Sequence, residues 1–243
     1  ITNGIHPFTW GSPYMMTLFD KYLPGWANEP ELLVRVDIIP DQEIQDAHAG
    51  AKAYLFQYIE EVSGEKFDPE ILTIGFARRA TAYKRANMIF NDHERLKKIG
   101  AGKLQLVFAG KAHPRDEGGK ELIRRIFKAA EALKPEVPVI YLQGYKMSLG
   151  RSLCSGVDLW LNTPMKPREA SGTSGMKVAP HGGLHLSILD GWGAGGDDGT
   201  SIAGARFRQG RSDGVGHGVG GRVEKGDAGA GEERDRCESI QQR

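Results

Sequence analysis

Cysteine is scarce in this sequence, and so is any excess of one charge. Only two of the 243 residues are cysteines, and Cys154 and Cys237 lie too far apart for the short spacing of a metal site. This usage is typical of a reduced, cytoplasmic setting rather than of a disulfide-rich secreted protein. The 32 Lys and Arg residues nearly cancel the 31 Asp and Glu residues, which leaves a net charge of +1. Such a balance predicts neither nucleic acid nor an anionic membrane as partner.

Long apolar runs are also missing. No run approaches the roughly 20 residues of a membrane span, and no basic segment followed by an apolar stretch marks a secretory signal. What the sequence does contain is 40% apolar residues, enough for a sizeable core in one or two domains. The chain begins at Ile1 rather than at a methionine, so we expect a fragment that lacks an N-terminal part.

Short apolar runs alternate with helical patterns along most of the chain. We predict strands at 71–77, 104–110, 138–144, 157–162 and 183–191. We predict helices at 12–22, 41–62, 83–100, 118–133 and 148–156. Continuous apolar strands that alternate with helices indicate an α/β fold, a parallel Rossmann-like sheet with helices on both faces. Ligands bind such sheets beyond the carboxyl ends of the strands. The loops at these ends are ARR (77–79), GKAHPR (110–115), QGYK (143–146) and NTPMKPREASGTSG (162–175).

The composition changes sharply after Trp192. Residues 1–192 form the predicted domain, whereas 193–243 is rich in Gly and Arg and has few large apolar residues. Such a segment buries too little surface to offset its ordering entropy, so we expect a disordered or out-of-frame tail. GWGAGG (191–196) matches a dinucleotide-binding pattern, but no helix pattern follows it. The tail repeats the match at 216–221, so composition explains both.

The segment EASGTSGMK (169–177) places small residues in front of one lysine. Small residues let the backbone approach a ligand closely, and amides at a helix start favour an anion. A nucleotide-triphosphate loop is excluded, because Met176 precedes the lysine and Val178 follows it. Lys177 in such a pocket can form a Schiff base with an aldehyde. The alternative is a glycine-rich turn with a surface lysine.

A second cationic segment, RRATAYKR (78–85), follows the first predicted strand. Its Arg78, Arg79, Lys84 and Arg85 suit one or two dianions. The alternative is a solvated face of the next helix. In the loop at 110–120, by contrast, helix-cap chemistry is the better interpretation of His113.

Together these segments resemble the α-glucan (glycogen, starch, maltodextrin) phosphorylase family, and in particular its shorter bacterial branch. The motifs, in the family's order, are TNGIHPFTW (2–10), RRATAYKR (78–85), VFAGKAHPRDEGGKELI (107–123), GYKMSLGRSL (144–153) and EASGTSGMK (169–177), followed by GGLHLSILDG (182–191). The resemblance covers about residues 1–192. It implies part of the C-terminal domain of a GT-B enzyme, whose active site lies between two Rossmann-like domains. The other domain would lie in the missing N-terminal part.

The resemblance also implies a reaction and a set of site residues. The reaction is phosphorolysis of a terminal α-1,4-linked glucose to glucose 1-phosphate, with pyridoxal 5′-phosphate held by Lys177 as a Schiff base. The substrates are an α-1,4-glucan and inorganic phosphate. The implied catalytic residues are Arg79, Lys84 and Lys177. The implied cofactor contacts are Lys177, Gly172, Thr173, Ser174, Tyr145, Lys146, Arg78 and Trp10. The implied substrate contacts are Asn3, Glu169 and Ser171 for the sugar, and Arg79 and Lys84 for phosphate. No metal is implied.

One departure and two rival hypotheses accompany this resemblance. Gly175 stands where many members carry Asn. The chain alone is expected to be inactive, because half of the cleft would be missing. The first rival is a nucleotide-sugar-dependent GT-B glycosyltransferase similar to a glycogen synthase, which needs no Schiff-base lysine. The second is a truncated, inactive remnant. The preferred glucan, self-association into a homo-oligomer and allosteric control stay open.

Overall fold

The computed structural model describes residues 3–191 and the backbone of residues 202–203. The tail predicted at 193–243 therefore lies outside the described residues, apart from that short segment. So does all of GWGAGG beyond Gly191.

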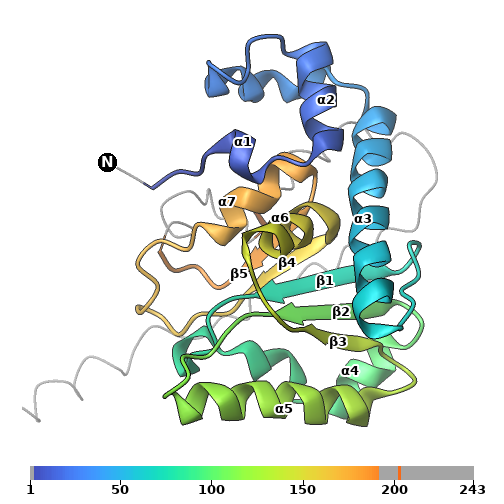
Figure 1. Ribbon diagram of the computed structural model, residues 1–243, viewed down its shortest axis with the longest axis vertical. Coiled ribbons are helices and arrows are strands. Elements are labelled where there is room, and N and C mark those ends of the chain that lie inside the picture. The colour runs from blue at the N-terminus through green and yellow to red at the C-terminus, as the bar shows by residue number, and fades with distance from the viewer. Residues whose placement is uncertain (1–2, 192–201, 204–243) are drawn as a thin grey trace, which may run out of the picture. The chain divides into compact units, whose positions relative to one another are not determined.

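A parallel sheet forms the centre of the fold (Figure 1). Its strands are β1 (Leu72–Ala77), β2 (Leu104–Ala109), β3 (Val139–Leu142), β4 (Leu159–Asn162) and β5 (Leu184–Ser187). The strand order is β3-β2-β1-β4-β5-β6, in which β6 (Ile202–Ala203) pairs antiparallel with β5. The pairs from β3 to β5 are all parallel. The predicted α/β fold with a parallel, Rossmann-like sheet is confirmed.

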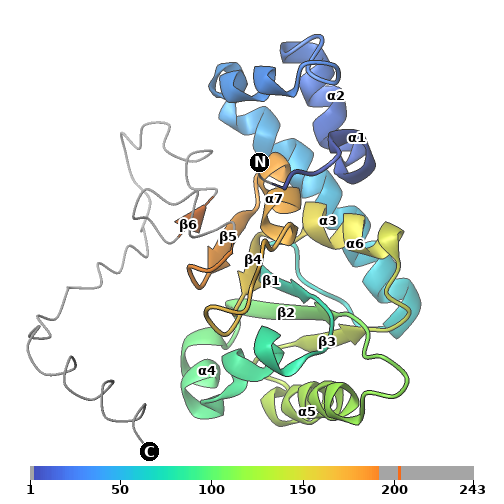
Figure 2. The same ribbon diagram turned by 90° about the vertical axis from the view of Figure 1, so that its left-hand side faces the viewer.

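Helices cover both faces of this sheet, as Figure 2 shows. One face carries α3 (Asp41–Ser63), α6 (Met147–Gly156) and α7 (Ser174–Val178). The other carries α4 (His93–Gly100) and α5 (Glu117–Leu133). Neighbouring strand residues alternate between the two cores: Ala77 packs with α3 and α6, whereas Phe76 packs with α4 and α5. This alternation explains why the strands read as continuous apolar runs.

The first forty residues add a small helical layer to the end of α3. It contains α1 (Pro7–Trp10), α2 (Pro13–Tyr22) and the 3₁₀ segment η1 (Pro30–Ile38). The predicted helix at 12–22 is confirmed: Oγ of Ser12 accepts from the Met15 amide at 3.3 Å and caps α2. The predicted helix at 41–62 is also confirmed, and it ends at Gly64 in the left-handed conformation.

One predicted helix is wrong. Residues 83–100 form not one helix but the 3₁₀ segments η2 (Ala82–Lys84) and η3 (Ala86–Phe90), followed by α4. The break is at Arg85, whose φ of 49° is left-handed and incompatible with a continuous helix. Its guanidinium donates to the carbonyls of Thr163 and Pro164 at 2.9 and 2.7 Å. These long-range bonds outweigh the local helix propensity.

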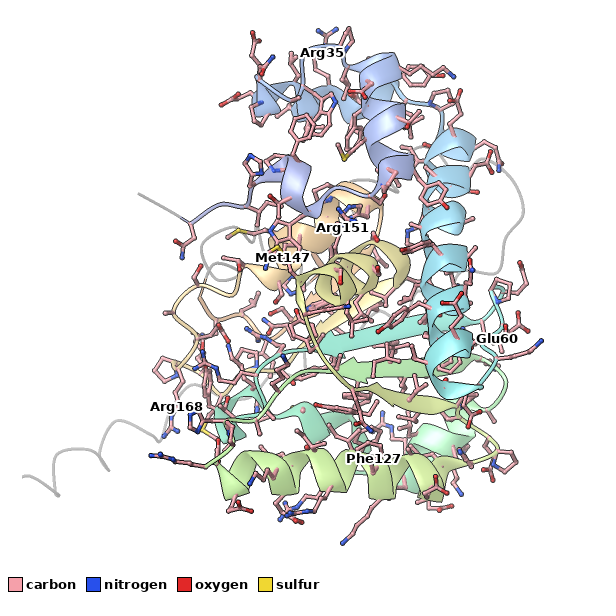
Figure 3. The ribbon with its side chains drawn as sticks, viewed as in Figure 1. Arg35, Glu60, Phe127, Met147, Arg151 and Arg168 are labelled. Carbon is pink, nitrogen blue, oxygen red and sulfur yellow. The ribbon has the colours of Figure 1, made fainter. Side chains whose placement is uncertain are left out.

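The topology places the carboxyl ends of the strands at one edge of the sheet. The strand order reverses between β1 and β4, so the two loops at this point diverge and leave room for a ligand. Figure 3 shows Arg168, in the loop after β4, at this end, and Glu60 of α3 at the opposite end. β5 ends at Ser187 and is shorter than the predicted 183–191. Beyond it the chain approaches the loop after β4, where Asp190 accepts from the Glu169 amide.

Candidate functional site

A cavity of about 340 Å³ opens where β1 and β4 end. Ligand pockets in proteins usually measure roughly 300–1,000 Å³. Nine of the residues predicted for the site line this cavity: Arg78, Arg79, Lys84, Tyr145, Glu169, Gly172, Thr173, Ser174 and Lys177. Loops that follow β1, β3 and β4 therefore meet at one place, as the strand topology implies.

The other predicted residues lie around or away from this lining. The ring of Trp10 faces Lys177. Ser171 is half-buried, and Lys146 and Asn3 are exposed. Sequence reasoning also missed lining residues, namely Ala77, Tyr83, Cys154 and Trp160. Ala77 and Trp160 belong to two of the predicted strands. Tyr83 belongs to the motif RRATAYKR, and Cys154 directly follows the motif GYKMSLGRSL. The loop after β2 contributes no lining residue, in line with the interpretation of His113 as part of a polar loop.

Two cations of the cavity share one carboxylate. The Arg78 guanidinium donates to Oε2 of Glu169 at 3.0 Å, and Nζ of Lys84 donates to the same oxygen. Arg78 also donates to Oδ1 of Asn162 at the end of β4. The Glu169 side chain is only 6% exposed, so water screens these pairs weakly. Two positive charges against one negative leave this cluster with an attraction for an anion, and exposed Arg79 adds to it.

Backbone contacts hold the loop after β1 in place. A Cβ at Gly110 would overlap the carbonyl oxygen of Arg78. The φ of Gly110 is 147°, a conformation that suits glycine alone. The Ala80 amide donates to the Lys111 carbonyl at 3.0 Å. Oγ1 of Thr163 donates to the Lys84 carbonyl at 3.1 Å. The loop after β2 thus supports the cationic loop from below without entering the cavity.

The loop after β5 supports Glu169 in a similar way. Asp190 accepts from the amide of Glu169 at 2.9 Å through Oδ2. The φ of Gly191 is 58°, and a Cβ there would lie 2.8 Å from the carbonyl oxygen of Ser171. Glycine at 191 therefore allows the two loops to approach closely.

The amine of Lys177 lies over the indole ring of Trp10. Its Nζ lies 3.6 Å from the centroid of the Trp10 ring. Burial lowers the pKa of Lys177, with an opposing effect from Cys154. A lowered pKa increases the fraction of neutral amine, which is the form that attacks a carbonyl. Burial also raises the pKa of the Cys154 thiol to about 12, so this neighbour is uncharged at neutral pH.

Two polar atoms of the lining are buried and lack a hydrogen-bond partner among the described residues. They are Oγ of Ser174 and Nε1 of Trp160. Buried polar atoms are nearly always paired, so such atoms point to a ligand or an ordered water. Between Trp160 and Ser174 the chain turns at Gly172, whose φ is 79°.

The position before Met176 is closed to a side chain. A Cβ at Gly175 would overlap the imidazole ring of His185 on β5. Burial lowers the pKa of His185 to about 4, and Arg78 acts in the same sense, so the ring is neutral at neutral pH. The glycine that departs from the family pattern thus matches a buried histidine behind it.

His181 connects the lysine to the N-terminal layer. Its Nδ1 lies 2.8 Å from the carbonyl oxygen of Lys177, and its Nε2 accepts from the Ser12 amide at 3.0 Å. Burial lowers the pKa of His181 to about 4, although the carbonyls of Lys177 and Trp10 act in the opposite sense. The ring is therefore neutral at neutral pH, and it lies between the turn that carries Lys177 and the turn that follows Trp10.

A second buried network holds the backbone of His181. Nδ1 of His48 lies 2.8 Å from the His181 carbonyl, and Nε2 of His48 lies 3.0 Å from Oδ1 of Asp158. Asp158 also accepts from Nζ of Lys52 at 2.8 Å and from the Thr73 amide at 2.7 Å. A carbonyl and a carboxylate both accept, so a protonated nitrogen of His48 donates to the group that it faces.

Two further features are absent from the described residues. No group of three or more His, Cys, Asp or Glu residues there is arranged to hold a metal ion. In the same part of the chain, no helix is both long enough and apolar enough to cross a membrane.

Comparison with known proteins identifies the family. The family model for carbohydrate phosphorylases matches residues 1–194. The chain is 41% identical to the maltodextrin phosphorylase of Thermococcus litoralis, over 79% of this chain and 25% of that protein. It is 39% identical to the glycogen phosphorylase of Aquifex aeolicus, over 79% of this chain and 31% of that protein. The glycogen phosphorylase of Mycobacterium tuberculosis is 36% identical over 79% of this chain and 25% of its own length. The chain thus spans about a quarter to a third of these relatives, and it belongs to the carbohydrate phosphorylase family.

Proposed function

We propose that this chain is the cofactor-carrying part of an α-glucan phosphorylase. The complete enzyme would transfer a terminal α-1,4-linked glucose from a glucan to inorganic phosphate and release glucose 1-phosphate. The observation that carries the proposal is the cavity itself, in which Lys177 and three further cations, Arg78, Arg79 and Lys84, line one space. The relatives named as maltodextrin and glycogen phosphorylases support it.

The lining fits pyridoxal 5′-phosphate. Lys177 supplies a partly buried amine of lowered pKa for the aldehyde. Oγ of Ser174 and the backbone of Gly172 and Thr173 would receive the phosphate, and Ser174 Oγ lacks another partner among the described residues. Tyr145 and Trp10 would flank the ring, and exposed Lys146 follows Tyr145 at the start of α6. When bound, the cofactor supplies a phosphate group that exchanges a proton with the substrate phosphate.

The chain's own residues would gather and neutralise the phosphates. Two phosphate dianions held close together repel each other by several kcal/mol unless cations surround them. Arg78, Arg79 and Lys84 line the cavity and would supply that charge, with Arg79 and Lys84 on the substrate phosphate. These cations would also hold the substrate phosphate in position to protonate the departing sugar oxygen.

Glu169 would contribute to the sugar site rather than act as an acid. Both of its cation contacts use Oε2, which leaves Oε1 for a glucose hydroxyl. The substrate phosphate would supply the proton to the departing sugar oxygen, so the proposed reaction needs no carboxylic acid at this position. Ser171 and Asn3 would complete the sugar contacts, together with groups from the domain that forms the other wall of the cleft.

Covalent trapping tests this proposal. The purified chain is incubated with pyridoxal 5′-phosphate, reduced with borohydride and mapped by peptide mass spectrometry. We expect the label on Lys177, and the Lys177→Met variant should lose it while Lys103 and other exposed lysines label equally weakly in both chains. Label that avoids Lys177 would refute the proposal and favour the nucleotide-sugar enzymes, which need no such lysine. We also expect no glucose 1-phosphate from the chain alone.

A further inference from the structure

The His181 ring contacts Lys177 on one side and the turn that follows Trp10 on the other. One ring nitrogen meets the carbonyl of Lys177 itself. The other meets the amide of Ser12, two residues after Trp10. His181 is only 1% exposed, so both hydrogen bonds are formed away from water. Figure 1 shows the corresponding elements, α1 and α7, next to each other.

The hydrogen bonds define one tautomer of this ring. A backbone amide only donates, so Nε2 of His181 must accept from Ser12. A backbone carbonyl only accepts, so the proton of the neutral ring is on Nδ1 and is donated to Lys177. No other neutral form makes both bonds, and the ring therefore joins the two segments in a single orientation.

We propose that His181 is a positioning residue that clamps Lys177 against the Trp10 ring. The inference rests on the proposed function, in which Lys177 carries the cofactor. The hydrogen bond to the Lys177 carbonyl fixes the turn of α7 that carries the amine. The hydrogen bond from the Ser12 amide fixes the turn that carries the Trp10 indole. His48 holds the clamp in turn, because its Nδ1 donates to the carbonyl of His181.

Ser12 offers a way to break one end of the clamp, because a proline there removes the N–H that points at Nε2 of His181 and its Cδ displaces the imidazole. Its φ of −76° is compatible with proline, and Gly11 has the extended backbone that precedes proline (φ −63°, ψ 136°). Ser12→Pro deletes the amide donor and the capping hydroxyl. Ser12→Ala deletes only the hydroxyl, which caps α2 through Met15, so it is the matched control.

The readout is the lysine–indole contact itself. Protons over the face of an aromatic ring are shifted upfield, and Nζ of Lys177 lies 3.6 Å from the Trp10 centroid. A carbon–proton spectrum of the lysine-labelled chain, without any cofactor, should therefore show displaced ε-methylene signals for Lys177. Lys177→Met assigns them, and Trp10→Leu defines the undisplaced position. We expect Ser12→Ala to keep the displacement and Ser12→Pro to lose most of it.

A second variant tests the same hydrogen bond in case Ser12→Pro does not fold. His181→Asn keeps a donor near the Lys177 carbonyl but removes the acceptor for Ser12, so it should lose the displacement as Ser12→Pro does. The double variant should lose no more, because both changes break the same bond. Unchanged displacement in either folded single variant would overturn the clamp.

Cofactor titration separates this inference from the proposed function. If both hold, Ser12→Pro should bind pyridoxal 5′-phosphate about fivefold more weakly than Ser12→Ala, the typical worth of one hydrogen bond. If no variant takes the cofactor on Lys177, the proposed function fails while the spectral result still decides the clamp. If the cofactor binds all variants equally and the displacement is unchanged, the clamp alone is refuted.

Discussion

Replacing Asp158 by Asn should destabilise the fold strongly, although it leaves the shape of the side chain intact. Asp158 accepts hydrogen bonds from His48, Lys52 and the Thr73 amide, and its side chain is 13% exposed. The Lys52 side chain is 8% exposed, and both His48 nitrogens face acceptors. Asn would retain some of the bonds but would leave the buried ammonium group of Lys52 without a counter-charge.

The expected cost follows from this burial. Removing one partner of a buried ion pair typically costs about 3–5 kcal/mol, since the remaining charge is not returned to water. We expect about 3 kcal/mol for Asp158→Asn, the lower end, because the amide still accepts from Thr73. With a urea dependence of about 2–3 kcal/mol per molar, the midpoint should fall by roughly 1–1.5 M.

Urea unfolding followed by circular dichroism measures this change. The matched control is Glu60→Gln, which breaks an ion pair with Lys66 whose side chains are 50% and 80% exposed. Such surface pairs contribute less than about 1 kcal/mol. If Asp158→Asn shifted the midpoint no more than Glu60→Gln does, the buried-charge reasoning would be refuted.

The pH dependence of the folding stability gives an independent test of the role of Asp158. Burial raises the pKa of Asp158, but its hydrogen bonds from His48, Lys52 and Thr73 together lower it below the usual value. A carboxyl whose pKa is depressed on folding stabilises the protein above its unfolded pKa of about 4. That contribution disappears as the pH falls through the folded value. The stability difference between parent and Asp158→Asn should therefore shrink in acid.

Three further changes test the packing around the cavity. Leu55→Ala should lower the free energy of unfolding by about 2–5 kcal/mol, since Leu55 is fully buried between α3 and the sheet; a loss below 1 kcal/mol in urea titration would contradict this. Gly110→Ala should cost at least about 1–3 kcal/mol in the same assay, because the new Cβ meets the Arg78 carbonyl at a φ that only glycine tolerates. Gly175→Asn should destabilise by about 1–3 kcal/mol, and adding His185→Ala should recover part of that loss; additive losses in the double variant would show that the two positions do not touch.

Much of the fold was predictable because its signals are local. Short apolar runs marked the five parallel strands, and Ser12 and Gly64 marked a helix start and a helix end. The grouping of the cationic segment with EASGTSGMK also followed from sequence, since carboxyl ends of parallel strands share one edge. The motifs also contain most of the residues that line the cavity.

What escaped prediction depends on contacts between distant segments. The break at Arg85 arises from carbonyls 78 and 79 residues away, which no local pattern reveals. His181 and His48 lay outside the residues singled out, because a single histidine has no spacing to mark it. Their roles emerge only where the N-terminal layer, α3 and the turn after Lys177 come together.

The carboxylate of Glu169 also bears on how the cavity treats dissolved ions. Because its Oε2 already occupies Arg78 and Lys84, an incoming anion does not meet bare cations but has to exchange with a resident counter-ion. A dianion brings two negative charges to Arg78 and Lys84 in place of the single charge of the carboxylate, whereas chloride brings only one. We therefore expect the cavity to behave as an ion exchanger that prefers divalent anions, so that ordinary salt competes poorly for it.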